Sequence, residues 1–419
     1  MTKTYEKYKD SGVAWIGEIP EGWKVYPFKS IFKTSKGLNI TKADLTEKGI
    51  PVINYGQIHS KNNPGTRIIK ELIRYVPEKY IASNPECLLP VGSILFADTS
   101  EDIEGCGNAV YIDQSDIIFA GYHTVVAKPN NSSNKYIAYQ LLTDCWRSQI
   151  RSVVNGIKVL SINQKFINST SIIFPPLSEQ QSIASFLDEK CGEIDSLIAL
   201  QEEMITELQD YKQSVISEVV TKGLDPNAKM KDSGVEWIGE IPEGWKVCKM
   251  QYLVSLQSGH NLTTEQILDE GAYPVFGGNG IRGYYQEYLN EGDFVLIGRQ
   301  GALCGNINYA HGKFWPTEHA VVCYPKVELE YKWLGETLRT MNLGQYSLSA
   351  AQPGLSVERI KQLPMPVPPL SEQQQIATYL DEKTQQIDTL ITLKQQKIEE
   401  LKDYKKSIIY EYVTGKKKV

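Results

Sequence analysis

The sequence predicts an α+β protein with two globular domains separated by two long antiparallel helices, which form a coiled coil with pseudo-twofold symmetry. Two duplicated blocks carry this prediction. KDSGVAWIGEIPEGWKV at 9–25 recurs as KDSGVEWIGEIPEGWKV at 231–247, and PPLSEQQSIASFLDEK at 175–190 recurs as PPLSEQQQIATYLDEK at 368–383. The segments between these blocks share almost no sequence. A repeated frame around unlike segments indicates a tandem duplication of a whole domain with its connector.

The repeats also predict where the parts begin and end. We expect an N-terminal repeat segment at 1–25, a first domain at 26–174, a central helical connector at 175–229, a second repeat segment at 230–247, a second domain at 248–367 and a C-terminal helical connector at 368–419. Each domain is long enough to bury a core of its own.

Composition narrows the class of protein. Of the 419 residues, 41% are hydrophobic and 22% are charged, which is ordinary for a globular chain. The sequence contains no run of 18 apolar residues, so no membrane span is expected. The first residues lack the apolar core of a secretory signal. The seven cysteines include no CxxC pair. We therefore expect a cytoplasmic protein with reduced thiols, no membrane contact and no zinc site.

The net charge of −6 is unevenly distributed. Residues 175–229 carry eleven acidic and four basic side chains, a balance of −7, so the acidic excess is concentrated in the connector. An acidic total does not exclude a locally basic face on either domain.

Both connectors are predicted to be helical. The paired prolines that open each one end the preceding strand, because proline cannot continue a hydrogen-bonded ladder. Ser178 and Ser371 are the expected N-caps. Glu179 and Glu372 follow them, in the first turn, where the helix dipole favours negative charge.

Apolar residues in the connectors recur at helical spacing and predict one stripe on each helix. A run of about 30 residues at 1.5 Å each gives a rod of roughly 45 Å. The two stripes are expected to pack on each other as an antiparallel coiled coil. In the alternative, each helix packs on its neighbouring domain. The stripe residues predicted for helix packing and partner docking are Ile194, Leu197, Ile198, Ile205, Leu208, Val215, Ile387, Leu390, Ile391, Ile398, Leu401 and Ile408.

The two domains show short apolar runs punctuated by glycine and asparagine, which predicts strands joined by tight turns. The repeated opening block predicts a packed turn. Its tryptophans, Trp15, Trp23, Trp237 and Trp245, are expected in the core.

No motif predicts catalysis. Residues 278–283 match GxGxxG, but the glycines lead into a strand rather than a helix, so a turn is expected instead of a dinucleotide site. There is no GxxxxGK[ST] or HExxH, and the five histidines lack metal-ligand spacing. Asp98, Glu101, Asp102 and Glu104 form an acidic loop, expected to be a solvated turn. We predict no catalytic residue, no metal and no cofactor in this chain.

The double pairing of a GxIPxGW block with a PPLxEQxxIAxxLD helix resembles the specificity subunit of a type I restriction–modification system. The resemblance includes the helix endings DYKQSVISEVVTKG and DYKKSIIYEYVTGK. It implies two target recognition domains, at 26–174 and 248–367, that each read half of a split double-stranded DNA target. It also implies that the helices set the spacer and dock two modification (methyltransferase) subunits. Those subunits bind S-adenosylmethionine and methylate adenine, and restriction and motor subunits complete the enzyme.

Base edges are usually read by Arg, Lys, Asn and Gln side chains. The candidate DNA-binding residues lie in loops of the two domains. They are Asn54, Gln57, His59, Lys61, Asn108, His123 and Lys158 in the first domain, and Asn279, Arg282, Arg299, Gln300, Asn306 and His319 in the second.

Two alternatives remain open at this point. One is a catalytic chain, a methyltransferase or nuclease with a diverged site. The other is a decoy or scaffold that binds modification subunits through its helices without reading DNA, which the acidic connector would suit.

Overall fold

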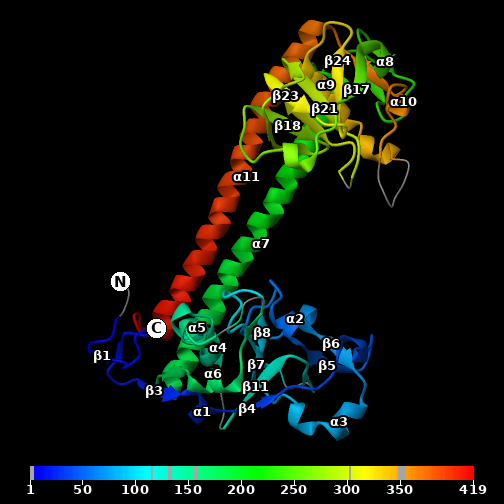
Figure 1. The fold of residues 1–419 in the computed structure, drawn as a ribbon. Coiled ribbons are helices and arrows are strands. Elements are labelled where there is room, and N and C mark those ends of the chain that lie inside the picture. The colour runs from blue at the N-terminus through cyan, green and yellow to red at the C-terminus, as the bar shows by residue number, and fades with distance from the viewer. Residues whose placement is uncertain are drawn as a thin grey trace. The chain divides into compact units, whose positions relative to one another are not determined.

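The computed structural model describes residues 4–114, 117–130, 135–154, 156, 159–301, 303–347 and 354–419. Its contacts divide the chain into two compact units (Figure 1). Unit 1 comprises Met1–Gln201 with Gln396–Val419, and unit 2 comprises Glu202–Gln395. Both boundaries fall inside the long helices α7 (Leu177–Lys222) and α11 (Leu370–Val413). Each unit therefore contains one α+β domain and a segment of both helices.

Unit 1 is built around a sheet in the order β4-β11-β7-β9. Its strands are β4 (Phe32–Lys36), β11 (Thr124–Pro129), β7 (Ile94–Ala97) and β9 (Ala109–Tyr111). A second sheet joins β10 (Phe119–Ala120), β5 (Ile50–Ile53) and β6 (Arg74–Val76), and β12 (Leu160–Ser161) pairs with β8 (Thr99–Ser100). The hairpin of β1 (Tyr8–Asp10) and β2 (Glu18–Pro20) holds the opening block, and β3 (Lys24–Pro27) pairs with β13 (Ser171–Phe174).

Short helices connect these strands in unit 1. They are α1 (Phe28–Ile31), η1 (Lys42–Asp44), α2 (Tyr55–Ile58), η2 (Lys70–Leu72), α3 (Lys79–Ser83), η3 (Pro85–Cys87), α4 (Lys135–Leu141), α5 (Asp144–Arg151) and α6 (Gln164–Ser169).

Unit 2 repeats the framework of unit 1. Its central sheet has the order β17-β24-β21-β22, from β17 (Val254–Ser258), β24 (Ala320–Pro325), β21 (Phe294–Gly298) and β22 (Ile307–Ala310). The second sheet joins β19 (Gly280–Tyr285), β18 (Tyr273–Gly277), β23 (Lys313–Pro316) and β20 (Asn290–Glu291). The repeated block forms the hairpin β14 (Met230–Asp232) with β15 (Glu240–Pro242), and β16 (Lys246–Lys249) pairs with β25 (Pro364–Val367).

The connecting helices of unit 2 are α8 (Met250–Leu253), η4 (Thr264–Gln266), α9 (Tyr331–Thr340), η5 (Leu343–Tyr346) and α10 (Val357–Ile360). The framework that the repeats predict thus extends through the interior of both domains, whose sequences show little likeness.

The long helices begin earlier than their capping pattern suggested. Helix α7 has 46 residues and α11 has 44, which at 1.5 Å per residue gives about 69 and 66 Å. Ser178 and Ser371 lie inside the helices, so the prediction that they are N-caps is wrong. Instead, the glutamine two residues after each serine bonds back to the proline segment that precedes the helix. Gln180 donates to the carbonyl of Pro175 at 2.8 Å, and Gln373 donates to the carbonyl of Pro368 at 2.9 Å.

The two helices run antiparallel within each unit (Figure 1). In unit 1, Lys405 of α11 pairs with Asp195 of α7 at 2.6 Å, while the rings of Tyr412 and Phe186 pack at a tilt with centroids 4.5 Å apart. From Lys405 to Tyr412 the residue numbers rise along α11, while their partners in α7 fall from Asp195 to Phe186. The two helices therefore run antiparallel.

In unit 2, Lys212 of α7 pairs with Asp388 of α11 at 2.7 Å, and Lys394 lies 3.3 Å from the sulfur of Met204. The direction of pairing is again antiparallel. The helices also pack on their domains, because Ile183 and Ile408 belong to the main core of unit 1. Pairing and domain packing therefore occur together.

The stripe residues differ in burial. Ile194, Val215, Ile387, Ile398 and Ile408 are buried, and Ile198, Ile205, Leu208, Ile391 and Leu401 are half-buried. Leu197 and Leu390 are both 47% exposed. The expectation that these two leucines lie in the packed stripe is wrong, because about half of each side chain is open to solvent.

The tryptophans of the two opening blocks also differ in burial. Trp23 and Trp245 are each 1% exposed and lie in the cores of units 1 and 2. Trp15 is 53% exposed, so the prediction of a core position is wrong for it. Trp237 is half-buried and packs against the core of unit 2.

A hydrogen bond explains why Trp23 and Trp245 are held so firmly. The indole nitrogen of Trp23 donates to Glu179 at 3.0 Å, and that of Trp245 donates to Glu372 at 2.9 Å. Each glutamate comes from the start of a long helix. The two repeated blocks are therefore joined in space, and the glutamates do more than favour the helix dipole.

Candidate nucleic-acid interface

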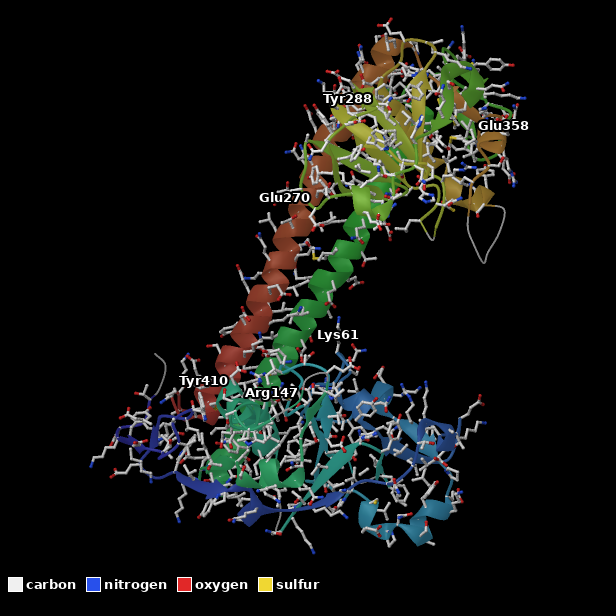
Figure 2. The ribbon with its side chains drawn as sticks, in the orientation of Figure 1. Lys61, Arg147, Glu270, Tyr288, Glu358 and Tyr410 are labelled. Carbon is white, nitrogen blue, oxygen red and sulfur yellow. The ribbon has the colours of Figure 1, made fainter. Side chains whose placement is uncertain are left out.

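Four of the seven predicted site residues of unit 1 line one hollow of about 760 Å³. His59, Lys61, Asn108 and His123 line it, together with Tyr55 and the acidic loop. Lys61 lies at the surface of unit 1 (Figure 2). These side chains come from three parts of the sequence, which the sheets bring together at the ends of β7, β9 and β11.

Hydrogen bonds fix the floor of this hollow. A ring nitrogen of His59, Nε2, lies 2.7 Å from the backbone oxygen of Thr99. The side-chain amide of Asn108 lies 3.2 Å from the other ring nitrogen. A carbonyl only accepts and an amide nitrogen only donates, so Nε2 carries the hydrogen and Nδ1 accepts. His59 is thereby held in one orientation between two loops.

Asn54 does not belong to the site. It is 1% exposed, its side-chain oxygen accepts from the backbone nitrogen of Tyr122 at 3.2 Å, and its amide donates to Gln57 at 3.2 Å. Asn54 also precedes α2 as its N-cap. A buried amide used in this way cannot reach DNA, so the prediction for Asn54 is wrong. Gln57 is half-buried, and its side-chain oxygen accepts the hydrogen bond from Asn54. Lys158 lies outside the described residues.

His123 is held in an unusual backbone conformation. Its φ of 54° is in the left-handed region, which costs a residue with a Cβ about 1 kcal/mol or more. The side chain is 59% exposed, and its Nδ1 lies 3.3 Å from Asp98. The rings of Tyr55 and Tyr122 contact it edge-on, at 5.3 and 5.9 Å between centroids. The strained backbone therefore presents an imidazole at the mouth of the hollow.

The acidic loop turns tightly and borders the hollow. The backbone nitrogen of Gly105 donates to Asp102 at 2.6 Å, and Glu104 pairs with Arg151 at 2.9 Å. Glu101, Asp102 and Glu104 all line the hollow beside Lys61. The lining of unit 1 is thus rich in hydrogen-bond acceptors.

The predicted residues of unit 2 come together at the matching end of its central sheet. The turn between β18 and β19 carries Asn279, whose side-chain oxygen accepts a hydrogen bond from Asn306. Gly278 in that turn lies against Gln300 and His319. The glycine pattern at 278–283 is therefore the turn of a hairpin, as expected, and opens no helix.

Basic side chains distinguish this second site. Arg299 donates to the hydroxyl of Ser258 at 3.3 Å, and its backbone nitrogen donates to the carbonyl of His319 at 2.8 Å. Arg282 is exposed on β19, with its methylene groups over Gly277. Unit 2 thus offers two guanidinium groups where unit 1 offers carboxylates.

Strand pairing shows that the two sites are built on equivalent positions. Thr124 pairs with Ala97 in unit 1, as Ala320 pairs with Gly298 in unit 2. His123 and His319 therefore occupy the same position, and their carbonyls accept from the nitrogens of Asp98 and Arg299.

The same reasoning aligns the turn before β9 with the turn before β22. Ile94 pairs with Tyr111, as Val295 pairs with Tyr309. The tripeptides Cys106-Gly107-Asn108 and Cys304-Gly305-Asn306 then coincide, and their glycines have φ of 91° and 90°. Sequence reasoning missed this correspondence, although the shared Cys-Gly-Asn was a usable signal.

The described residues contain no cluster of three or more His, Cys, Asp or Glu side chains that could hold a metal ion. In the same part of the chain, no helix is long and apolar enough to cross a membrane.

Comparison with known proteins gives one family. The type I restriction modification DNA specificity domain matches at residues 20–209 and again at 242–403. The EcoprrI type I restriction enzyme specificity subunit of Escherichia coli is 41% identical over 134 residues, which cover 31% of this chain and 33% of that protein. A putative type I restriction enzyme MjaX specificity subunit of Methanocaldococcus jannaschii is 28% identical over 240 residues, covering 56% and 53%.

The chain thus matches about a third to a half of the length of these two relatives. A solved structure from work on complex assembly and conformational transition of the type I R-M system is similar over 94% of this chain and 98% of its own, with a TM-score of 0.69. At 17% sequence identity, this similarity establishes the fold alone.

Proposed function

This chain belongs to the type I restriction modification DNA specificity family, and we propose that it is the non-catalytic subunit that selects a bipartite DNA target. Each unit reads one half of the target. The paired helices set the unread spacer. The subunit contributes no chemistry of its own, and it acts in the cytoplasm with its partner subunits.

The observation that carries this proposal is one framework with two different linings. The central sheets of both units pair in the same order, and loops from equivalent positions converge at one end. A protein that reads two unlike half-sites needs this combination of constant scaffold and variable side chains. A single catalytic centre would need neither.

The linings suggest different base preferences for the two units. Carboxylates such as Asp102 only accept hydrogen bonds, and in the major groove the amino groups of cytosine and adenine are the donors they can meet. Arginine pairs best with guanine. We therefore expect unit 1 to favour cytosine or adenine, whose amino groups lie in the major groove. We expect unit 2 to read guanine through Arg282 or Arg299.

The exposed faces of the long helices support docking of two modification subunits. Leu197 and Leu200 of α7 are 47% and 48% exposed, and Leu390 and Leu393 at the equivalent positions of α11 are 47% and 55% exposed. Tyr404 and Tyr211 are exposed equivalents as well. Each unit thus presents two leucines from one helix and a tyrosine from the other.

Two copies of one apolar set suit two copies of one partner. We propose that the partners are methyltransferase subunits, which supply S-adenosylmethionine and methylate adenine. Restriction and motor subunits would join the same assembly.

Footprinting of the complex between this chain and its modification subunits tests the proposal. We expect two protected segments separated by an unprotected spacer, and methylated adenine in both segments. A catalytic chain would transfer methyl groups without a partner. A decoy would bind the modification subunits but leave no bipartite footprint, and either result would overturn the proposal.

A further inference from the structure

A second cleft, of about 740 Å³, lies beside the hollow of unit 1. Helix α5 and the segments of α7 and α11 that belong to unit 1 form its walls, so we call it the helix-side cleft. Arg147 of α5 and Tyr410 of α11 both line it (Figure 2). Glu104 lines the cleft as well as the hollow, so the two are direct neighbours.

The charge of the helix-side cleft is opposite to that of the hollow. Three carboxylates and one lysine line the hollow. The cleft also has three carboxylates, but five cationic side chains accompany them. These are Arg147, Arg151, Lys402, Lys405 and Lys406. A polyanion that reaches the hollow is repelled there by the carboxylates and attracted by the cleft beside it.

The three carboxylates of the cleft are already paired within the protein. Arg151 lies 2.9 Å from Glu104 and 3.0 Å from Asp144. Lys405 lies 2.6 Å from Asp195, in the pair that joins α11 to α7. Two of the five cations therefore neutralise the carboxylates, and three remain for a ligand.

Two of the remaining cations are lysines with exposed side chains. Lys402 is 47% exposed and Lys406 is 75% exposed, one helical turn apart on α11. Each pairs with an exposed carboxylate three residues before it, Glu399 at 2.8 Å and Asp403 at 3.0 Å. Exposed pairs of this kind contribute less than about 1 kcal/mol, so both ammonium groups can turn to a stronger anion.

The third remaining cation, Arg147, is half-buried. Its guanidinium donates to the backbone oxygens of Leu141 and Glu104, at 3.3 Å each. Among the residues that the structure describes, no carboxylate lies within 4 Å of it, because Glu104 and Asp144 pair with Arg151. Burial and the charge of Arg151 lower the pKa of Arg147. A bound anion would offset both effects.

Unit 2 has no lysine at the two corresponding helix positions. DYKQS at 210–214 duplicates DYKKS at 403–407, so Gln209 and Gln213 correspond to Lys402 and Lys406. The duplicated helix forms with either pair of residues, and the fold therefore does not depend on these lysines.

Unit 2 also lacks the arginine. Gly305 lies against Gly344 as Gly107 lies against Arg147, so a glycine replaces Arg147 in unit 2. The second unit has its arginines within the recognition site instead, at Arg282 and Arg299. The unit with an acidic site is thus the one that carries a basic cleft next to it.

The helix-side cleft differs from the apolar surface proposed to dock the modification subunits. Lys402 and Lys406 each lie two residues from Tyr404, which at 3.6 residues per turn is about 200° around α11. Tyr404 is 57% exposed and belongs to that apolar set, whereas Lys402, Lys406 and Ile409 share the face that lines the cleft.

We infer that the helix-side cleft binds the sugar–phosphate backbone of DNA beside the half-site that unit 1 reads, through Arg147, Lys402 and Lys406. The inference rests on the proposed function. Backbone contacts supply affinity and fix the register of the protein on the duplex, and base contacts supply specificity. In unit 1 these two tasks fall to neighbouring sites, the basic cleft and the acidic hollow. This division explains how an acidic lining holds a polyanion.

The salt dependence of DNA binding tests this inference, using the full chain bound to its modification subunits. Lys402→Gln with Lys406→Gln gives unit 1 the residues that unit 2 carries. Loss of two phosphate contacts should reduce the slope of log affinity against log salt by about 1.8. Affinity at a fixed salt concentration should fall on the order of tenfold, as for two exposed ion pairs. The selected motif should stay the same.

Lys190→Gln with Lys397→Gln is the matched control. It removes the same charge from α7 and α11 within unit 1, at exposed lysines that do not line the cleft. The control should leave the slope unchanged. An unchanged slope in the cleft variant, or an equal reduction in both variants, would overturn the inference.

Two further readouts identify other roles for the cleft. A change in the selected motif would mean that it reads bases, and loss of a modification subunit in native mass spectrometry would mean that it binds protein. Either result would overturn the inference and leave the proposed function standing. If the unsubstituted complex selects no bipartite motif, the proposed function fails, and the inference fails with it.

Discussion

Trp245→Ala is expected to destabilise unit 2 by about 3–5 kcal/mol, the cost of truncating a fully buried tryptophan. Trp245 is 1% exposed and packs in the same core as Val220, Ile241 and Ile376. The substitution also removes the donor to Glu372 and leaves that carboxylate without the indole. Domains are stable by only about 5–15 kcal/mol, so most of that stability would be lost.

Thermal unfolding, monitored through hydrogen exchange in peptides from unit 2, measures this loss. Trp15→Ala is the control, because it makes the same change in the unit 1 copy of the block, at a side chain that is 53% exposed, and its effect is read on peptides of unit 1. We expect the control to shift stability by no more than about 0.5 kcal/mol. Equal effects of the two substitutions would contradict the assignment of Trp245 as the core anchor.

A second large effect is expected at the exposed leucines of the helices. Leu390→Asp combined with Leu393→Asp should remove one of two modification subunits from the complex, because charged groups cannot enter an apolar contact without a large desolvation cost. The chain itself should stay folded, since both side chains are about half exposed. Native mass spectrometry of the assembled complex would report the change in stoichiometry.

Thr389→Asp with Thr392→Asp serves as control, because it adds the same charge at two exposed neighbours on the same helix. The equivalent change at Leu197 and Leu200 should remove the other subunit. Retention of both modification subunits by the Leu390 and Leu393 variant would contradict docking at these residues.

Much of the fold could be predicted from this sequence because the apolar residues of the long helices recur at helical spacing. Apolar spacing, with no proline or glycine in 193–222 and 384–414, predicted the two long helices, and the repeats predicted two equivalent units. The capping pattern misled at Ser178, because the helix already begins at Leu177, directly after Pro176. The partners of Glu179 and Glu372 are tryptophans 156 and 127 residues away, and no local pattern reports so distant a contact.

The candidate site was harder to predict. Asn54 has the right chemistry for reading bases, but burial at the start of α2 assigns it to the scaffold. The shared pattern His-x-Val-Val, at 123–126 and 319–322, could have aligned His123 with His319, and strand pairing gives the same alignment.

Exchange of residues 26–174 for the corresponding domain of another family member is the most direct test that two separate readers share one frame. Methylated adenines would be mapped across the genome of cells carrying the exchanged chain with its modification subunits. The account predicts that one half of the methylated motif changes while the other half is retained. A change in both halves, or in neither, would contradict it.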